Sequence, residues 1–150
     1  MIHIERLQTY SEQDAIELGL LRPVLSPGSL DTPVEEAHLT HIIESPDKDQ
    51  LVARLEDTRR IVGAATLNVV SGALAGNNGY LMDFVTEPNA GVKGIGTLVW
   101  NEMGVWCNEH GIDLRFTSKP TRQAAHNFYH KHGAEETGST AFVVRFPEQS

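Results

Sequence analysis

The sequence contains little cysteine, no long apolar run and few basic residues. Its single cysteine, Cys107, has no partner for a disulfide within the chain, which fits a reducing compartment. No stretch of about 18 apolar residues occurs, so no membrane span is expected. The N-terminus lacks a basic segment followed by an apolar run, so no signal peptide is expected either. We therefore predict a cytoplasmic protein without a membrane partner.

Negative charge predominates in the chain. There are 20 Asp and Glu residues against 12 Lys and Arg residues, which gives a formal net charge of −8 at pH 7. Proteins that bind nucleic acid generally present a basic face, so we expect no nucleic-acid partner. The excess of acid favours cationic substrates through electrostatic steering, although solubility is the simpler explanation. The 150 residues suffice for one sizeable core, and we predict a single domain over residues 1–150.

Hydrophobic periodicity and turn residues divide the chain into strands and helices. The predicted strands are residues 2–7, 50–56, 60–70, 79–86, 112–118 and 140–146, and the predicted helices are residues 12–25, 33–43, 94–110 and 121–133. The resulting order, β-α-α-β-β-β-α-β-α-β, indicates an α+β sandwich in which helices cover a mixed sheet.

Several residues mark local features of these elements. Ser11 is the expected N-cap of the first helix, and Thr32 with Glu35 forms an expected capping box for the second. Residues 71–78 are predicted to be a flexible glycine-rich loop, and Gly63 to Ala65 indicate close packing or a bulge. The predicted buried stripes are Ile16, Leu20 and Leu21 in the first helix and Leu98, Val99, Met103 and Trp106 in the third.

A glycine-rich stretch lies near the middle of the chain. Residues 83–98 read as a buried strand, a loop broken by Pro88 and then the start of a helix. The glycines of this loop allow tight turns and close approach of the backbone to a ligand. The first amides of a helix have no internal partner and carry a positive partial charge. The stretch therefore predicts a site for an anion, most often a phosphate.

Two common phosphate loops do not fit these residues. A dinucleotide-binding loop needs G-x-G-x-x-G, but Val99 stands where the third glycine after Gly94 and Gly96 is required. A nucleoside-triphosphate loop needs G-x-x-x-x-G-K-[ST], but Thr97 follows Gly96 directly and the lysine is missing.

Two blocks of sequence fit another family better. The first is Thr86-Glu87-Pro88 followed by Gly91 to Gly96, and the second contains Ala125, Phe128-Tyr129 and Gly133. In this order and separation they resemble the GNAT superfamily of acetyl-CoA-dependent N-acetyltransferases, over residues 50–146 by motif and over the first 50 by topology alone. The resemblance implies a GNAT-like mixed, mostly antiparallel central sheet of about six to seven strands, flanked by four helices.

The resemblance also implies acetyl-CoA as a co-substrate and no metal. The pantetheine arm would pair with the main chain at the end of the central strand, and the pyrophosphate would bind the loop amides. The residues expected to bind the cofactor are Phe84, Val85, Thr86, Gly91, Val92, Lys93, Gly94, Ile95, Gly96, Thr97, Arg122, Phe128 and Tyr129. Relatives usually have Arg or Gln in place of Gly91 and often Asn in place of Arg122, whose planar fork could reach a phosphate or simply face solvent.

Acyl transfer to an amine requires a base, an oxyanion donor and an acid. Tyr129 stands where the family keeps the acid that protonates the thiolate, and the amide of Val85 is the expected oxyanion donor. Similar sequences often carry a glutamate base at the position of Met82, which cannot accept a proton. Asp83 is the candidate base, directly or through water, but strand alternation turns it to the other face unless a bulge intervenes. Water relayed to Glu87 or to a histidine is the remaining alternative.

Histidine and cysteine suggest no further chemistry. His126 and His130 are four residues apart on a predicted helix, but the glutamate of H-E-x-x-H is absent, so a metal site is not expected. Cys107 is expected to be a buried helix residue without a reactive role.

The interpretation from sequence is an N-acetyltransferase that moves an acetyl group from acetyl-CoA to a primary amine by direct transfer. One alternative is a non-catalytic acyl-CoA-binding or regulatory module with a GNAT fold, suggested by Met82 and Gly91. Another is a plain nucleotide-binding domain. The acceptor, a small-molecule or peptide amine, is expected to be selected by residues 26–32, the second helix and residues 71–78, and the sequence leaves a homodimer open.

Overall fold

The computed structural model describes residues 1–146. The chain forms two compact units, Met1–Phe116 and a C-terminal unit that begins at Thr117, and each is described by itself. The first unit holds the sheet and three helices, and the second holds α4 (Gln123–Lys131). No helix within the described residues is both long and apolar enough to cross a membrane.

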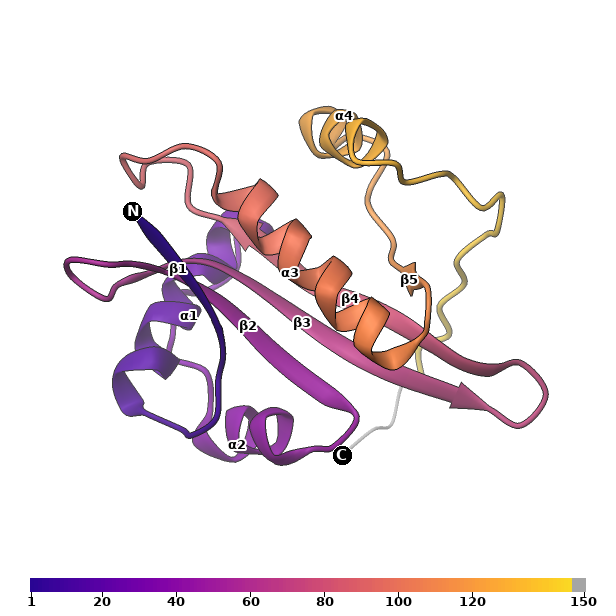
Figure 1. The fold of residues 1–150 in the computed structure, drawn as a ribbon, viewed down its shortest axis with the longest axis horizontal. Coiled ribbons are helices and arrows are strands. Elements are labelled where there is room, and N and C mark those ends of the chain that lie inside the picture. Colours follow the sequence, from indigo (N-terminus) through magenta and orange to yellow (C-terminus); the bar gives the residue numbers. More distant parts are fainter. Residues whose placement is uncertain (147–150) are drawn as a thin grey trace. The chain divides into compact units, whose positions relative to one another are not determined.

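The sheet of the first unit has the strand order β1-β2-β3-β4-β5 (Figure 1). Strands β1 to β4 run antiparallel to their neighbours, whereas β5 runs parallel to β4. The predicted α+β class, the mixed, mostly antiparallel sheet and the four helices are confirmed, but the described chain forms five strands instead of six or seven. The strands are β1 (Ile2–Arg6), β2 (Lys48–Leu55), β3 (Ile61–Gly72), β4 (Gly76–Thr86) and β5 (Leu114–Arg115).

Three predicted segments differ from the structure. Residues 140–146 belong to no strand, and the strand expected at 112–118 is reduced to β5. A strand needs a neighbour that satisfies its backbone N–H and C=O groups, and alternating apolar residues do not supply one. The predicted loop at 71–78 is instead the tip of a hairpin, because β3 runs to Gly72 and β4 begins at Gly76. Gly76 has a φ of 76°, which suits the last residue of a short hairpin turn.

Helices cover both faces of this sheet (Figure 1). α3 (Ile95–His110) packs on one face, and α1 (Glu12–Leu25) and α2 (Glu36–Glu44) pack on the other. Successive residues of a strand point to opposite faces. Leu51 and Ala53 of β2 therefore join the cluster under α3, whereas Val52 joins the cluster under α1 and α2. Burial on both faces explains the uninterrupted apolar run at the start of β3.

The buried stripes of the helices follow the prediction except at Ile16, which is only half-buried, and at two leucines. Leu21 of α1 and Val99, Met103 and Trp106 of α3 are buried, but Leu20 and Leu98 are 53% and 41% exposed. Each exposed leucine directly precedes a buried residue, and one step along an α-helix turns the side chain by about 100°. Leu20 and Leu98 therefore face away from the sheet.

The predicted N-cap of α1 is confirmed, and that of α2 is wrong. Ser11 Oγ accepts a hydrogen bond from the Asp14 amide at 3.1 Å. α2 begins only at Glu36, with Glu35 as an N-cap that makes no side-chain capping bond. Thr32 is engaged elsewhere, because its carbonyl oxygen accepts a 2.7 Å hydrogen bond from Arg22 Nη1 on α1. A tertiary contact has thus replaced the local capping box.

A buried ion pair joins α1 to the sheet. Arg54 of β2 donates from Nη1 and Nη2 to the two carboxylate oxygens of Asp14, both at 2.9 Å, and from Nε to Glu5 of β1. The hydrogen bonds to Asp14 and then to Glu5 raise the pKa of Arg54 above its ordinary value against the opposing effect of burial. Two parallel bonds fix the orientation of α1 as well as its distance from β2.

Gly19 lets the segment before α2 approach α1 closely. A Cβ at Gly19 would lie 2.2 Å from the Thr32 carbonyl oxygen, which is far inside van der Waals contact. We expect Gly19→Ala to lower the free energy of unfolding by about 1–3 kcal/mol, because the backbone of residue 32 must move. Urea unfolding followed by circular dichroism measures this change.

Gly104→Ala is the matched control. Gly104 also lies within a helix, and a Cβ there would meet no atom within 4 Å. This substitution should raise the free energy of unfolding by about 0.5–1 kcal/mol, because alanine is the better helix former. Equal effects of the two substitutions would contradict the close contact at Gly19.

Candidate functional site

Strand β4 contains a bulge near its end. Ala64 of β3 pairs with Val85, but Thr66 pairs with Met82, so two steps along β3 match three along β4. Asp83 lies within this interval and has a φ of 56°, in the left-handed region. An extra residue of this kind interrupts the alternation of side chains along the strand.

The bulge changes which side chain is presented to the site. With regular alternation along β4, the side chain of Asp83 would point away from the amine. A bulge changes the direction of that side chain. Asp83 lines a cavity together with Thr66 and Val85, whereas Met82 is 56% exposed and does not line it. The structure therefore brings Asp83 and Val85 together at one wall.

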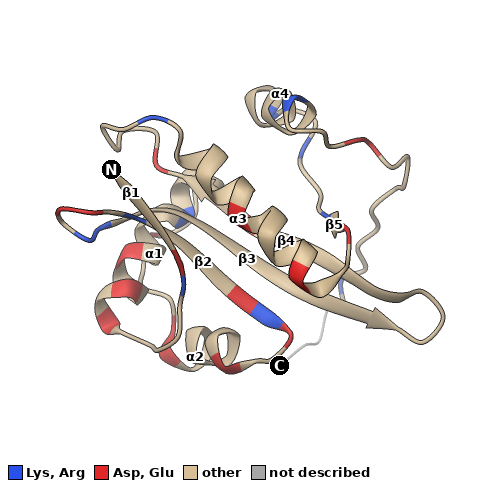
Figure 2. Ribbon diagram, in the orientation of Figure 1, with Lys and Arg blue, Asp and Glu red and all other residues tan. Residues whose placement is uncertain are grey.

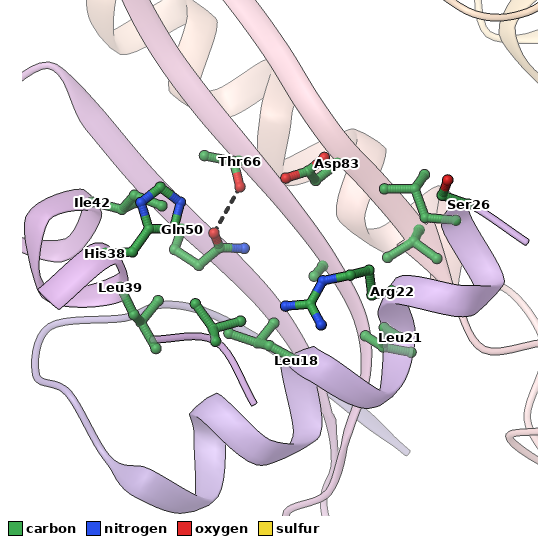
Figure 3. Close-up of a pocket in the computed structure, with 14 residues that line it drawn as sticks. Leu18, Leu21, Arg22, Ser26, His38, Leu39, Ile42, Gln50, Thr66 and Asp83 are labelled. Carbon is green, nitrogen blue, oxygen red and sulfur yellow. Dashed lines mark hydrogen bonds between the residues drawn. The ribbon is translucent and has the colours of Figure 1, made fainter. Parts of the chain in front are cut away.

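This cavity of about 340 Å³ lies between the sheet and the two helices α1 and α2 (Figure 3). Ala64 and Val85 belong to its sheet wall. Its remaining apolar wall consists of Leu18, Leu21, Leu25, Val34, Leu39 and Ile42, and its polar groups are Arg22, Ser26, His38, Gln50, Thr66 and Asp83. Residues of α2 and Ser26 line it, whereas none of its described lining residues comes from 71–78, which extends β3 and β4 instead.

Gln50 and Thr66 are site residues that the sequence analysis missed. Both are buried, at 5% and 8% exposure. Gln50 Nε2 donates to the carbonyl oxygens of Leu51 at 3.1 Å and Ala65 at 3.2 Å, and Thr66 Oγ1 donates to Gln50 Oε1 at 2.7 Å (Figure 3). A glutamine at the head of the apolar run Leu51 to Ala53 was the available signal, since buried polar side chains need partners.

The glycine-rich loop leads from β4 into α3. Gly91 and Gly94 have φ values of 80° and 83°, and a Cβ on either would meet no atom within 4 Å. Gly94 is the N-cap of α3, makes no side-chain capping bond, and is followed by a first turn without acidic residues. Leu98 is the first residue of the helix whose amide donates back, to Gly94 at 3.1 Å.

The amides before Leu98 remain available to an anion. Within the described residues, the amides of residues 92–97 donate no loop or side-chain hydrogen bond. Unsatisfied amides at a helix N-terminus carry positive partial charge. The predicted phosphate site thus has the backbone geometry of an anion site. Its residues are Val92, Lys93, Gly94, Ile95, Gly96 and Thr97.

The ladder between β4 and β5 is short. It pairs Gly79 with Leu114 and Tyr80 with Arg115, so it ends before residues 84–86. The backbone amide of Glu87 donates to the Val62 carbonyl at 2.8 Å. Because every second residue of a strand points its backbone groups to the same neighbour, the Val85 amide also points toward β3. The amide and carbonyl of Thr86 point to the opposite edge.

Aromatic side chains from β4, from α3 and from the residue after β5 form a cluster beside this edge of β4. The rings of Phe84 and Trp100 lie 6.4 Å apart, and Trp100 meets Phe116 edge-on at 6.0 Å. Cys107 of α3 is half-buried instead of fully buried as expected, and this burial raises the pKa of its thiol.

The C-terminal unit carries the remaining predicted residues. Tyr129 of α4 is buried, and its ring meets Phe128 edge-on at 6.2 Å. Arg122 is the N-cap of α4, which begins at Gln123 and not at Thr121. His126 and His130 take part in no metal-binding group among the described residues. Because Tyr129, Phe128 and Arg122 lie in a different unit from Asp83, their roles stay predictions.

These features agree with comparisons to known proteins. The sequence profile described as the Acetyltransferase (GNAT) family matches residues 19–134. The chain therefore belongs to the GNAT acetyltransferase family and is an acyltransferase. A search of curated protein sequences found no match.

Solved structures show the same fold at low sequence identity. An aminoglycoside acetyltransferase, meta-AAC0020, from an uncultured soil metagenomic sample, in complex with trehalose, has a TM-score of 0.80 at 23% identity and covers 97% of both chains. The aminoglycoside 6'-N-acetyltransferase AAC(6')-Ih from Acinetobacter baumannii has a TM-score of 0.74 at 18% identity, covering 97% of this chain and 99% of its own. AAC(6')-Iy, solved with the bisubstrate analog CoA-S-monomethyl-acetylneamine, has a TM-score of 0.74 at 17% identity with the same coverage.

The bulge yields a prediction about stability. A β-branched residue at a φ of 56° costs about 1–2 kcal/mol, whereas asparagine tolerates the left-handed region. We expect Asp83→Val to be less stable than Asp83→Asn by about that amount, measured as the free energy of unfolding in urea.

Met82→Val is the control for this comparison. Met82 is exposed and its φ is not positive, so valine there should change stability by no more than about 0.5 kcal/mol. If Asp83→Val and Asp83→Asn unfold at the same urea concentration, the left-handed backbone at residue 83 is contradicted.

Proposed function

We propose that the protein transfers the acetyl group of acetyl-CoA directly to a primary amine, with the whole chain of residues 1–150 acting as one acetyltransferase domain. One observation carries the proposal: a single strand, β4, presents the bulged Asp83 to a cavity and leads at its end into the amides of residues 92–97. An acceptor and an anionic cofactor can thus meet at the end of one strand. The CoA-containing analog bound by AAC(6')-Iy lends support, since that protein shares the fold.

The glycine-rich loop is the proposed site of the cofactor's pyrophosphate. Amides of residues 92–97 donate to the phosphate oxygens, and no acidic residue of the first turn opposes them. Gly91 contributes backbone freedom, and Lys93 is exposed beside these amides and adds a positive charge. Arg122 is the proposed second cation for the phosphates, in keeping with its planar fork.

The end of β4 is the proposed binding site for the pantetheine arm. Thr86 points its amide and carbonyl to the edge that β5 does not reach, so its carbonyl can accept a hydrogen bond from an amide of the arm while its N–H stays free for the reacting thioester. Phe84 and Val85 flank this position on the same strand. Phe128 and Tyr129 are further residues proposed to contact the cofactor, as the family resemblance implies.

In the proposed reaction the amine nitrogen attacks the thioester carbonyl carbon. A C–N bond forms and the C–S bond breaks. A lysine-like amine has a pKa of about 10.4, so its deprotonation at pH 7 costs roughly 4–5 kcal/mol. Asp83 accepts the first proton of the ammonium, directly or through water, and Tyr129 protonates the departing thiolate; the second proton that the attacking nitrogen loses restores the phenol of Tyr129. We assign the developing oxyanion to the Thr86 amide in place of Val85, whose amide the sheet register directs toward β3.

Activity is tested with acetyl-CoA and a panel of primary amines, read out as thiol release. Tyr129→Phe removes the proposed acid and should lower kcat by about 100-fold while leaving the affinity for acetyl-CoA nearly unchanged in calorimetry. Tyr80→Phe, at an exposed position on β4, is the control and should change neither quantity. Binding of acetyl-CoA without turnover of any amine would instead support a non-catalytic acyl-CoA-binding module.

The phosphate site is tested separately by solution NMR. Acetyl-CoA should shift the amide resonances of residues 92–97, because these amides donate to the pyrophosphate. Acetyl-pantetheine lacks the pyrophosphate, so it should leave those resonances in place while shifting Thr86. Loop amides that do not respond to millimolar acetyl-CoA would refute the proposed cofactor site.

Two expectations from the sequence stay predictions: a cytoplasmic location and the absence of nucleic-acid and membrane partners. A homodimer stays open, as in the sequence analysis.

A further inference from the structure

We propose that the cavity between α1, α2 and the sheet receives a small primary monoamine with an apolar body, rather than a polycationic amino sugar. This inference names the acceptor of the acetyl transfer and therefore rests on the proposed function. It follows from the hydrogen-bonding character of the polar groups in the cavity, from its apolar wall and from the balance of its charges.

The polar groups next to Asp83 offer acceptors only. Both N–H groups of the Gln50 amide are used by the carbonyls of Leu51 and Ala65, which fixes the amide orientation and leaves Oε1 as an acceptor. Thr66 must then donate its hydroxyl hydrogen to that oxygen, so its own free lone pairs also accept. Thr66, Gln50 and Asp83 all line the cavity, and Figure 3 shows them along its sheet side.

A primary ammonium group matches this set of acceptors. It has three N–H donors and no acceptor, whereas a hydroxyl or amide group needs both kinds of partner for full satisfaction. Asp83 supplies the compensating negative charge, because charge-assisted hydrogen bonds are the stronger ones. The ammonium is thus held beside the carboxylate that accepts its proton in the reaction.

Six apolar side chains predominate in the rest of the cavity, whose lining also includes Arg22, Ser26 and His38, and they suit an apolar body. Leu18, Leu21, Leu25, Val34, Leu39 and Ile42 form its helical wall, and Leu21 and Leu39 belong to the buried core cluster. Hydroxyl groups placed against these side chains would lose water without gaining hydrogen-bond partners. The volume of about 340 Å³ is at the small end of ligand pockets.

The charges of the cavity disfavour a second cation. Asp83 is the single acidic residue in its described lining, and the other formally charged side chain is Arg22. Arg22 Nη1 donates to the carbonyl oxygens of Leu30 at 3.0 Å and Thr32 at 2.7 Å, which holds the guanidinium at the wall. Figure 2 shows that the acidic residues are spread over several helices and loops, so the net charge of −8 is not concentrated at this cavity.

Competing amines test the inference. Arylalkyl and branched-alkyl primary monoamines, an α,ω-diamine and an aminoglycoside are compared by kcat/KM for thiol release with the intact protein. In parallel, calorimetry in the presence of CoA measures the binding of each amine without turnover. The monoamines should exceed the aminoglycoside at least 10-fold in kcat/KM and bind at least 10-fold more tightly.

Two variants locate the effect in the cavity. Thr66→Val removes one acceptor of the ammonium and should raise the KM and the calorimetric Kd for the monoamine about 10-fold. Thr40→Val is its control, since Thr40 lies on α2 but does not line the cavity. Ile42→Glu adds an acid to the apolar wall and should shift the amine preference toward the diamine. This shift can be measured even if Thr66→Val fails to fold.

The two levels of the proposal fail separately. Faster turnover and tighter binding of the aminoglycoside would overturn the monoamine inference while leaving acetyl transfer standing. Monoamine binding in calorimetry without any thiol release would support the cavity assignment and overturn the proposed function. An unchanged amine preference in Ile42→Glu, with an unchanged KM in Thr66→Val, would show that amines do not bind this cavity.

Discussion

The single extra residue in β4 is the constraint on which the site depends. Without the bulge at Asp83, side chains would alternate regularly from Gly79 to Thr86, and the carboxylate would leave the cavity. The bulge exists because Ala64 keeps its pairing with Val85 and Thr66 keeps its pairing with Met82 on either side of it. Buried neighbours on β3 fix both pairings. A left-handed aspartate is a local cost that the surrounding ladder maintains, as is usual for strained residues at functional sites.

The cavity in turn depends on how α1 and α2 are held over the sheet. Arg54 fixes α1 through two parallel hydrogen bonds to Asp14, while Gly19 and Arg22 bring the backbone of Thr32 against the same helix. These contacts hold the apolar side chains of the two helices over the cavity, with Gln50 and Thr66 on its sheet side. The resulting pocket has acceptors on its sheet side and a mainly apolar helical wall that also holds Arg22, Ser26 and His38, and this difference in polarity carries the inference about the acceptor.

Much of the fold could be predicted from the sequence because its signals are local. Ser11 caps α1 with its own side chain and the glycine loop acts through its own backbone conformation, while helix and strand periodicities placed most elements within a few residues. The failures arose where a partner decides the outcome. Residues 140–146 alternate like a strand but have no ladder, the 71–78 loop is drawn into a hairpin, and Thr32 is engaged by Arg22 instead of capping α2.

The sequence by itself determined the family, the α+β class and the glycine-rich turn that leads into α3, because motif spacing and glycine conformation are properties of short segments. Only the tertiary structure decided that Asp83, Thr66 and Gln50 share one cavity and that β5 leaves β4 after Tyr80. The physical reason is that side-chain direction within a sheet depends on register and bulges. Both are set by the pairing of strands distant in sequence, and a one-residue change in that pairing reverses every following side chain.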